Sequence, residues 1–481
     1  MAPDPVGIRS SLYKPLSATD VTQIANGAFE VLEKSGVAVY SDQALRAFEK
    51  IGADIDRETR IVKLSRTQVE DAVASNPSSI TLYSRDGRFD AVLEKNRVHY
   101  GTGGTAIYVL DPETGERRNS NVGDVILNAR MVDALEHIHV FTINVFPHDV
   151  ENRDHIDVNR FYHAFDNTSK HVMGGIYSMK GSRNVVRMAE TIAGGPEALR
   201  AKPFVSFITL IISPFKIDKE YGDMTCYFAE QGLPVVVPTE PIAGTTSPVT
   251  LAGNVLTHIA ETLAGIALVQ SVRPGAPGIC GGVGSITNLM TMDHLAGPIE
   301  RAMVNAAVAQ MAQHFQLPMY STGGTTDAKE VDAQAVFETA LSSQLVAMSG
   351  ANYIHDIAGL MESDLTVSYE KLVIDNEILG MIQRVLRGIE VNDKTLAVDV
   401  LIKQGPGGNF MAEKHTLEHM RGEFFFPKLA NRQTRGRYDP NDTSMDRAKA
   451  FVAKVRESQP ESRLPDDVRT QITGMFPEII V

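Results

Sequence analysis

The sequence has no tryptophan, only two cysteines and no excess of positive charge. Cys226 and Cys280 are too few for a disulfide framework or a four-thiolate zinc site in 481 residues, which favours a reducing compartment. A formal net charge of -13 argues against a phosphate backbone or an anionic membrane as a partner. The N-terminus lacks the apolar core of a signal peptide, and no apolar run reaches the roughly 18 to 20 residues of a membrane span. We therefore expect a cytoplasmic protein without nucleic acid or membrane partners.

From about residue 98 the chain alternates short runs rich in Val, Ile, Phe and Tyr with longer, Ala-rich stretches at helical spacing. Eight short runs occur, at residues 98–110, 139–146, 170–178, 204–212, 233–240, 278–286, 318–324 and 351–360. A strand, a helix and a second strand of this size form a right-handed βαβ unit. Eight such strand–helix repeats in succession close into an α/β structure, the (β/α)₈ or TIM barrel. An open doubly wound sheet is the competing arrangement. The even spacing and the lack of a nucleotide-binding fingerprint favour the barrel.

The two ends of the chain lack the regular alternation of strand and helix candidates that the middle shows. Residues 1–97 contain three helix candidates and a hairpin-like segment with Asp86 and Gly87 at its turn, which we interpret as an N-terminal cap. Residues 98–365 form the predicted barrel. Residues 366–481 become helical again and then rich in proline and charge, which predicts a C-terminal helical extension packed on the barrel.

Paired glycines recur where the predicted strands end. They are Gly103 and Gly104, Gly174 and Gly175, Gly281 and Gly282, and Gly323 and Gly324. In a (β/α)₈ barrel the active site lies at the C-terminal ends of the strands, and glycine lets a ligand approach the backbone closely. Relief of crowding inside the barrel is the alternative for any single pair. Four pairs in equivalent places favour a binding role.

Tyrosine is the aromatic residue that stands out in the predicted strands. The tyrosines there are Tyr100, Tyr108, Tyr177, Tyr320 and Tyr353. Tyrosine rings can hold a quaternary ammonium by cation–π attraction, at roughly 0.5 to 2 kcal/mol per ring. Each could equally be a core residue whose hydroxyl is hydrogen-bonded.

Polar side chains also occur where predicted strands end. His355 and Asp356 are neighbours in the last strand, so the period of two predicts that one faces the barrel interior and the other the helix layer. An inward histidine is a candidate site residue, and a hydrogen-bonded core histidine is an equal alternative. Glu240 after the fifth strand and Asp327 after the seventh are similar candidates.

Five blocks of the sequence, in order, resemble the trimethylamine methyltransferase (MttB-like) family. They are GTGGTAIYVLDPETGERR (101–118), YSTGGTTDAKEVDAQ (320–334), GANYIHDIAGLMES (350–363), LVIDNEILGMIQRVLRGIEV (372–391) and GPGGNFMAEKHTLEHMR (405–421). The resemblance implies a (β/α)₈ barrel enzyme that moves a methyl group from an amine to the Co(I) of a corrinoid (cobalamin) carried by a separate partner protein. It implies no tightly bound metal and a place in one-carbon metabolism related to methanogenesis, and it leaves homo-oligomerisation open.

One departure from the family pattern bears on the substrate. The archaeal trimethylamine enzymes carry pyrrolysine at or near the loop GGTTDAK, where this chain has Thr325 and Thr326. The chain thus resembles the non-pyrrolysine branch, some of whose members demethylate glycine betaine and related quaternary amines. A quaternary ammonium leaves as a neutral amine, so the protein must supply position and electrostatics rather than an acid.

The resemblance and the residue pattern together give a hypothesis for the site. Tyrosines 100, 108, 177 and 320 would surround the trimethylammonium head of a betaine. The carboxylate needs a donor, for which His355 is the first choice and Lys329 the second. Asp327, Glu240 and Asp356 would orient those donors or add to the field of the cation, with His355 and Asp327 taken as catalytic.

Two other classes of function stay open. A metal-dependent barrel hydrolase or lyase would need a site made of scattered residues, such as Cys280 with His294 or His355, because no zinc motif occurs. A non-catalytic betaine-binding protein would bind the ligand without demethylating it.

Overall fold

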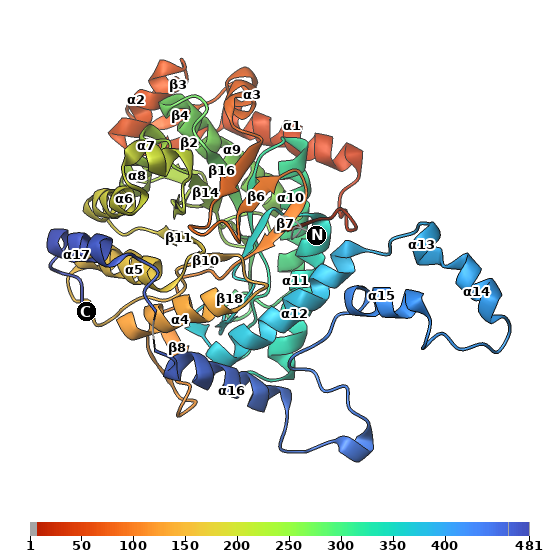
Figure 1. The fold of residues 1–481 in the computed structure, drawn as a ribbon. Coiled ribbons are helices and arrows are strands. Elements are labelled where there is room, and N and C mark those ends of the chain that lie inside the picture. The colour runs from red at the N-terminus through yellow and green to blue at the C-terminus, as the bar shows by residue number, and fades with distance from the viewer. Residues whose placement is uncertain (1–6, 460, 481) are drawn as a thin grey trace.

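The computed structural model describes residues 7–459 and 461–480. Its centre is a barrel of eight parallel strands, around which the helices are arranged (Figure 1). The strands are β7 (Arg97–Tyr100), β10 (Val140–Thr142), β11 (His171–Gly175), β12 (Val205–Ile208), β14 (Val235–Thr239), β16 (Gly278–Gly282), β19 (Met319–Thr322) and β20 (Tyr353–His355). They follow one another around the sheet from β10 to β20, and β20 then pairs with β7. A parallel bridge between Gly101 and Val140 joins β7 to β10. The prediction of a (β/α)₈ barrel is confirmed.

Helices surround the barrel and follow its strands. They are α4 (Val122–Ala134), α5 (Arg153–Asn167), α6 (Met179–Ala193), α7 (Pro196–Ala201), α8 (Lys219–Gln231), α9 (Leu251–Val272), α10 (Ile299–His314), α11 (Ala333–Ser349) and α12 (Tyr369–Arg387). Most begin at a side-chain cap, such as Asp218 before α8, and several end at a left-handed glycine, such as Gly232. Within the described residues, α9 is the one helix long and apolar enough to cross a membrane by composition, and most of it is buried against the barrel and the N-terminal helices.

The N-terminal segment covers one end and one side of the barrel. Helices α1 (Ala18–Lys34), α2 (Asp42–Lys50) and α3 (Arg66–Ser75) pack on α9. A small sheet joins β2 (Val37–Val39), β3 (Asp54–Asp56) and β4 (Ile61–Lys63) to β13 (Lys216–Ile217), and β1 (Ile8–Arg9) pairs with β7. The hairpin of β5 (Ser79–Leu82) and β6 (Ala91–Glu94) packs Ile80, Leu82 and Leu93 against inward residues of the barrel strands. This hairpin fills the N-terminal end of the barrel.

Two small sheets stand at the opposite, C-terminal end of the strands. One contains β8 (Tyr108–Leu110), β9 (Arg117–Asn119), β21 (Leu360–Met361) and β22 (Thr366–Val367), and the other β15 (Ile242–Ala243), β17 (Ser285–Thr287) and β18 (His294–Leu295). The sequence predicts one strand over 98–110, and this is wrong. The chain leaves the barrel after Gly101, passes Gly104 with φ of +80°, and enters the separate strand β8.

The C-terminal segment divides into parts that pack on the barrel helices and a part that does not. Helix α16 (Ser444–Glu457) lies against α4 and α12, and α17 (Asp466–Met475) lies against α6. Between α12 and α16 come α13 (Asp393–Leu396), α14 (Val398–Gln404), α15 (Lys414–Glu423) and a 3-10 turn, Arg435–Arg437. Residues 388–426, which carry α13 to α15, project from the body (Figure 1), and we call them the projecting arm. The division of the chain at residues 97 and 365 stays a prediction.

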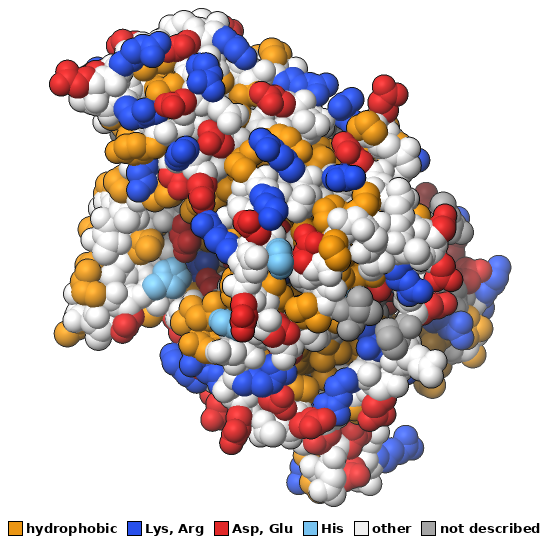
Figure 2. All heavy atoms as spheres, turned by 90° about the vertical axis from the view of Figure 1, so that its left-hand side faces the viewer, with side chains coloured by type: hydrophobic (Ala, Val, Ile, Leu, Met, Phe, Trp, Pro, Cys, Tyr) orange, Lys and Arg blue, Asp and Glu red, His pale blue; other side chains and the backbone are white. Residues whose placement is uncertain are grey.

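The surface carries charge of both signs. Figure 2 shows Lys and Arg side chains interspersed with Asp and Glu side chains over one face of the molecule. Ion pairs such as Arg153 with Glu220, at 2.9 Å, bring the two signs together at the surface. Exposed pairs of this kind contribute about 0 to 1 kcal/mol each, so the buried core rather than the surface holds the fold.

Candidate functional site

A cavity of about 620 Å³ opens at the C-terminal ends of the barrel strands. Its walls come from strand ends and from the two small sheets. The polar and aromatic residues that line it are Thr105, Thr209, Tyr221, Glu240, His294, Tyr320, His355, Asp356, Ser363 and Asp364. This is the end of a (β/α)₈ barrel at which catalytic residues collect, so we take this cavity as the candidate site.

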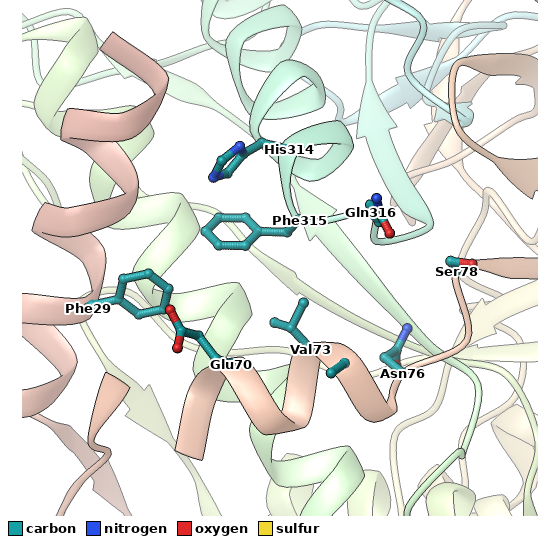
Figure 3. Close-up of a pocket in the computed structure, with 9 residues that line it drawn as sticks. Phe29, Glu70, Val73, Asn76, Ser78, His314, Phe315 and Gln316 are labelled. Atoms are coloured by element: carbon teal, nitrogen blue, oxygen red, sulfur yellow. The ribbon is translucent and has the colours of Figure 1, made fainter. Parts of the chain in front are cut away.

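A second pocket lies at the other end of the barrel (Figure 3). Phe29 of α1, Glu70 of α3 and the residues that end α10, including His314 and Phe315, line it. The Glu70 carboxylate is already paired with Arg66 at 2.7 Å, and the Arg66 guanidinium lies 4.7 Å from the centre of the Phe29 ring. The chain therefore neutralises the charge of the Glu70 carboxylate itself.

His355 and Tyr320 form the centre of the cavity wall. Their rings stack with centres 3.8 Å apart at 25°, and His355 is 3% exposed. Nε2 of His355 lies 2.8 Å from Oδ2 of Asp356, and Nδ1 lies 2.5 Å from the carbonyl oxygen of Ser321. Both ring nitrogens are therefore engaged by the protein, which leaves His355 no free donor for a substrate carboxylate.

Asp356 faces the same cavity as His355, which corrects the prediction that the two would face opposite sides. The strand ends at His355, and Asp356 has φ of +61°, a left-handed conformation that breaks the alternation of side chains. Gly103 makes this possible because a Cβ there would lie 2.2 Å from Oδ1 of Asp356 and 2.6 Å from Cδ2 of His355. One of the predicted glycine pairs thus permits two segments of this chain to approach each other closely, instead of permitting a ligand to approach the backbone.

Burial governs the ionisation of Tyr320. It raises the pKa of the hydroxyl well above its usual 10, so the group stays protonated and can donate a hydrogen bond. His355 covers one part of the ring, and Tyr353 lies with its ring centre 5.6 Å away. Tyr320 therefore offers the cavity little open ring face for a cation, and Tyr221, from the start of α8, is the other tyrosine in the wall.

Three carboxylates and one guanidinium set the charge of the cavity. Glu240 and Asp356 line it together with Asp364, which lies 3.0 Å from Nη2 of Arg301. Burial raises the pKa of Asp364, but the charge of Arg301 outweighs it and lowers the pKa to about 2. His294 lies 3.9 Å from Asp364 and 4.0 Å from Glu240. With three negative groups against Arg301, the cavity favours a cation.

A buried cation lies behind the part of the cavity wall formed by Thr105 and Gly175. Arg160 of α5 is fully buried, donates from Nη1 to the carbonyl of Gly175 at 2.9 Å and from Nη2 to Oγ1 of Thr105 at 3.4 Å. Both acceptors belong to cavity-lining residues. The Asp157 carboxylate lies 3.9 Å from Nη1 of Arg160, too far for a hydrogen bond, and burial raises the pKa of Asp157 to about 7. The positive charge of Arg160 is therefore incompletely balanced by the protein.

Glu261 of α9 supports the loop after β12, which contributes Thr209 and Leu210 to the cavity. Its carboxylate accepts hydrogen bonds from the backbone N–H of Phe215 at 2.8 Å, from the hydroxyl of Ser213 at 2.7 Å and from Thr239. Burial outweighs these hydrogen bonds and raises the pKa of Glu261 to about 7.

Three of the predicted tyrosines do not line the cavity. Tyr100 packs among core residues of the helix layer and stacks on His139, because it alternates with the inward His99. Tyr108 lies in the small sheet, with the guanidinium of Arg117 3.4 Å from its ring centre. Tyr177 packs with Phe146, at 5.6 Å between ring centres. The structure therefore does not bring the four predicted cage tyrosines together.

The loop after β19 supports the cavity from behind. Asp327 accepts hydrogen bonds from the hydroxyl of Ser363 at 2.7 Å and from the backbone N–H of Ala296 at 2.8 Å. Lys329 is exposed and donates to the carbonyl of Asp327 at 2.7 Å, outside the cavity lining. Asp327 thus holds the segment 362–364, whose three residues all have positive φ, in the position that directs Asp364 inward.

The sequence reasoning missed five lining or supporting residues as site residues: His294 as a substrate contact, Arg160, Arg301, Asp364 and Tyr221. The run of acidic and polar residues in MESD, directly after the last strand, could have pointed to Asp364. Arg301, within a helix, and His294, in a small sheet, carry no local signal. Their place depends on contacts between segments far apart in the chain.

Among the described residues, no group of three or more His, Cys, Asp and Glu side chains is arranged to hold a metal ion. Cys280, considered as a ligand with His294 or His355, packs in the helix layer. Burial raises the pKa of its thiol to about 12, so it is not available as a thiolate.

Comparison with known proteins places the chain among methyltransferases. The model of one family, described as trimethylamine methyltransferase (MTTB), matches residues 5–476. A trimethylamine methyltransferase of Desulfitobacterium hafniense (strain DSM 10664 / DCB-2) is 37% identical over 411 residues, which are 84% of this chain and 81% of that protein. A glycine betaine methyltransferase of Desulfitobacterium hafniense (strain Y51) is 30% identical over 424 residues, 87% of each chain. The crystal structure of the Methanosarcina barkeri monomethylamine methyltransferase has a TM-score of 0.49 and 15% identity, covering 99% of this chain and 96% of that one.

Proposed function

The chain belongs to the trimethylamine methyltransferase family and is a methyltransferase, and we propose that it transfers a methyl group from a betaine to the Co(I) of a corrinoid carried by a separate protein. The observation that carries the choice of a charged substrate is the cavity itself. Glu240, Asp356 and Asp364 line it, while Arg160 lies behind Thr105 and Gly175 of the same wall. A zwitterion, with a cation at one end and a carboxylate at the other, fits this division of charge.

The quaternary ammonium binds at the acidic part of the cavity. Three carboxylates favour its fixed positive charge, and the ring of Tyr221 supplies an aromatic contact worth about 0.5 to 2 kcal/mol. The substrate carboxylate lies near Thr105 and Gly175, above the incompletely balanced charge of Arg160. This arrangement replaces His355 and Lys329 as its donors, because the ring nitrogens of His355 are engaged and Lys329 lies outside the lining.

The chemistry needs position more than proton transfer. The corrinoid partner supplies the Co(I) nucleophile that accepts the methyl group. The positively charged nitrogen leaves as a neutral tertiary amine with the electron pair of the broken C–N bond, so no acid is required. The residues of this chain bind the amine, aim one methyl group at the cavity opening and exclude water. His355 holds Tyr320 and Asp356 in place through the stacked rings and the Nε2 contact.

The test is incubation of the protein with reduced cobalamin and a panel of methylated amines that includes glycine betaine and trimethylamine. We expect a betaine to convert Co(I) to methyl-Co(III), seen in the visible spectrum, with release of the demethylated amine. Trimethylamine should react much more slowly, because it lacks a carboxylate for the Arg160 side. If no amine raises methylcobalamin above the protein-free control, the catalytic proposal is wrong, and trimethylamine turnover equal to that of the best betaine would contradict the substrate class.

Two further measurements separate the other classes of function. Elemental analysis of the purified protein that finds one equivalent of zinc or magnesium would favour a metal-dependent hydrolase or lyase. Calorimetric binding of a betaine without demethylation by any corrinoid would favour a binding protein.

A further inference from the structure

Exposed apolar side chains gather on one side of the cavity opening. The eight loops that follow the barrel strands all lie within the described residues, and five large hydrophobic side chains in them are exposed: Val249, Leu289, Met290, Met292 and Leu365. These five belong to the loops after β14, β16 and β20, which share one side of the barrel because the sheet order runs β20, β19, β16, β14. The described loops after β7, β10, β11 and β12 contain none of them. The opening therefore has one apolar side.

Three of these side chains form the tip of the hairpin that joins β17 to β18. Leu289 is 55% exposed, Met290 is 95% exposed and Met292 is 64% exposed. We call residues 288–293 the hairpin tip. Single exposed apolar side chains are ordinary on a protein surface, whereas three within four consecutive residues form a patch. A patch of this kind marks a surface that contacts another molecule.

The backbone of the hairpin tip bonds to itself. Asn288 donates its backbone N–H to the carbonyl of Asp293 at 2.9 Å, and its own carbonyl accepts from the N–H of Met292 at 2.6 Å. Oδ1 of Asn288 accepts from the N–H of Met290 at 3.1 Å. The tip is thus a defined turn that presents its apolar side chains outward. A surface held in this way loses little conformational freedom when a partner binds to it.

The hairpin is fixed to the wall of the cavity. Val283, which precedes β17, and His294, which begins β18, both line the cavity. Leu289 packs on the loop after β14, since a Cβ on Gly244 would lie 2.7 Å from Cδ2 of Leu289. A strand rises about 3.3 Å per residue, so the chain from His294 to Met290 spans at most about 13 Å. The tip therefore stands at the cavity opening.

The acceptor of the methyl group determines what reaches the hairpin tip. In the proposed reaction, the cobalt has to approach the methyl group in line with the C–N bond that breaks. Cobalt lies at the centre of the corrin macrocycle, which is much wider than a methyl group, so the edge of the ring extends beyond the cavity onto its rim. That edge carries methyl groups as well as amides. Methionine side chains are flexible and polarisable and fit an irregular apolar surface of this kind.

We propose that the hairpin tip holds one edge of the corrin macrocycle over the cavity, through Leu289, Met290 and Met292. This inference rests on the proposed methyl transfer to a corrinoid. The contact sets the tilt of the ring and so the line from the cobalt to the methyl group, on which an in-line displacement depends. Loss of the apolar side chains should weaken corrinoid binding and leave amine binding unchanged, because the described lining of the cavity includes none of the three.

Binding of methylcobalamin to the full chain, without any amine, tests this proposal. Equilibrium dialysis of the wild type should give a dissociation constant on the order of 1 mM or lower. Met290→Asp should raise this constant about 10-fold, and Met290→Asp combined with Met292→Asp should raise it further, because carboxylates then face the apolar edge of the ring. The matched control is Leu12→Asp, which should leave the constant unchanged. Leu12 is 61% exposed and bonds to Met348 at the end of α11, at the opposite end of the barrel.

A second measurement uses the lack of tryptophan in the chain. Met290→Trp places a single indole at the hairpin tip, and a corrin ring bound there quenches its fluorescence by absorbing the emitted energy. The fluorescence should therefore fall along the same binding curve as the dialysis gives. Leu12→Trp is the control, whose emission should fall only by the absorption of light by free methylcobalamin.

Circular dichroism and thermal unfolding check that each variant keeps the fold of the wild type, and calorimetric titration with glycine betaine compares amine binding. A wild type that binds no methylcobalamin at about 1 mM would overturn the proposal. Folded Met290→Asp and double variants that keep the dissociation constant of the wild type would overturn it as well. None of these measurements requires methyl transfer. A failure of the proposed reaction appears as absent turnover, whereas a failure of the hairpin contact appears as unchanged or absent methylcobalamin binding.

Discussion

Gly103→Ala should disable the site with little change in its charge. The added Cβ would lie 2.2 Å from Oδ1 of Asp356, 0.8 Å short of the 3.0 Å that Cβ atoms keep, and 2.5 Å from the Asp356 nitrogen. The backbone of Asp356 therefore has to shift by about 1 Å, and this shift displaces the contact between the Asp356 carboxylate and Nε2 of His355. A displacement of that size in a positioned group costs about 100-fold in rate, and overpacking costs about 2 kcal/mol of stability.

The assay is kcat/KM for the best betaine, followed as formation of methyl-Co(III), together with the midpoint of thermal unfolding. Gly474→Ala in α17 is the control, since a Cβ there meets no atom of the described residues within 4 Å, and it should leave both quantities unchanged. If Gly103→Ala keeps kcat/KM within about threefold of the wild type and the same midpoint, the paired geometry of His355 and Asp356 does not control methyl transfer.

The remaining predictions concern the cavity wall, its support and its charge. Tyr221→Leu should raise KM for the betaine roughly 2-fold to 30-fold by removing the aromatic contact, while Tyr221→Phe keeps it, and equal KM values for both variants would contradict that contact. Because folding raises the pKa of Glu261 from 4.5 to about 7, the free energy of unfolding should fall as the pH rises from about 4.5 to 7. In urea titrations, Glu261→Gln should remove about 3 kcal/mol of this fall. An unchanged pH dependence in the variant would refute the assignment. Asp364→Asn leaves buried Arg301 without its nearest counter-charge and should lower the free energy of unfolding by about 3 kcal/mol, and a variant as stable as the wild type would show that Asp356 and Glu240 suffice.

The barrel could be predicted from the sequence because its strands carry a local signature. Runs such as LPVVVPTE and FVSFITLII are buried on both faces, and each is followed by a helix of ordinary length with recognisable caps. The break within residues 98–110 could not be predicted in the same way. Val98 to Leu110 reads as one extended segment, and the positive φ at Gly104 and the pairing of β8 with residues 366–367 separate it into two strands.

The candidate site could be predicted in part for the same reason. Tyr320, His355 and Glu240 stand on or directly after strands, and a barrel brings all strand ends to one place. The orientation of Asp356 depends on a single backbone angle, and Asp364 reaches the cavity through three successive left-handed residues. Such conformations are uncommon outside glycine, and local sequence does not reveal where tertiary contacts will impose them.

The hairpin of β5 and β6 has a consequence for the order of events in the proposed reaction. Because the side chains of the hairpin fill the N-terminal end of the barrel, the amine and the corrinoid must both reach the cavity through its opening at the C-terminal end. A docked corrinoid protein would stop the amine from entering, so the amine arrives first and the demethylated product departs last, after undocking. Steady-state kinetics should therefore be sequential and ordered, and an excess of the corrinoid protein should inhibit turnover at low amine concentration.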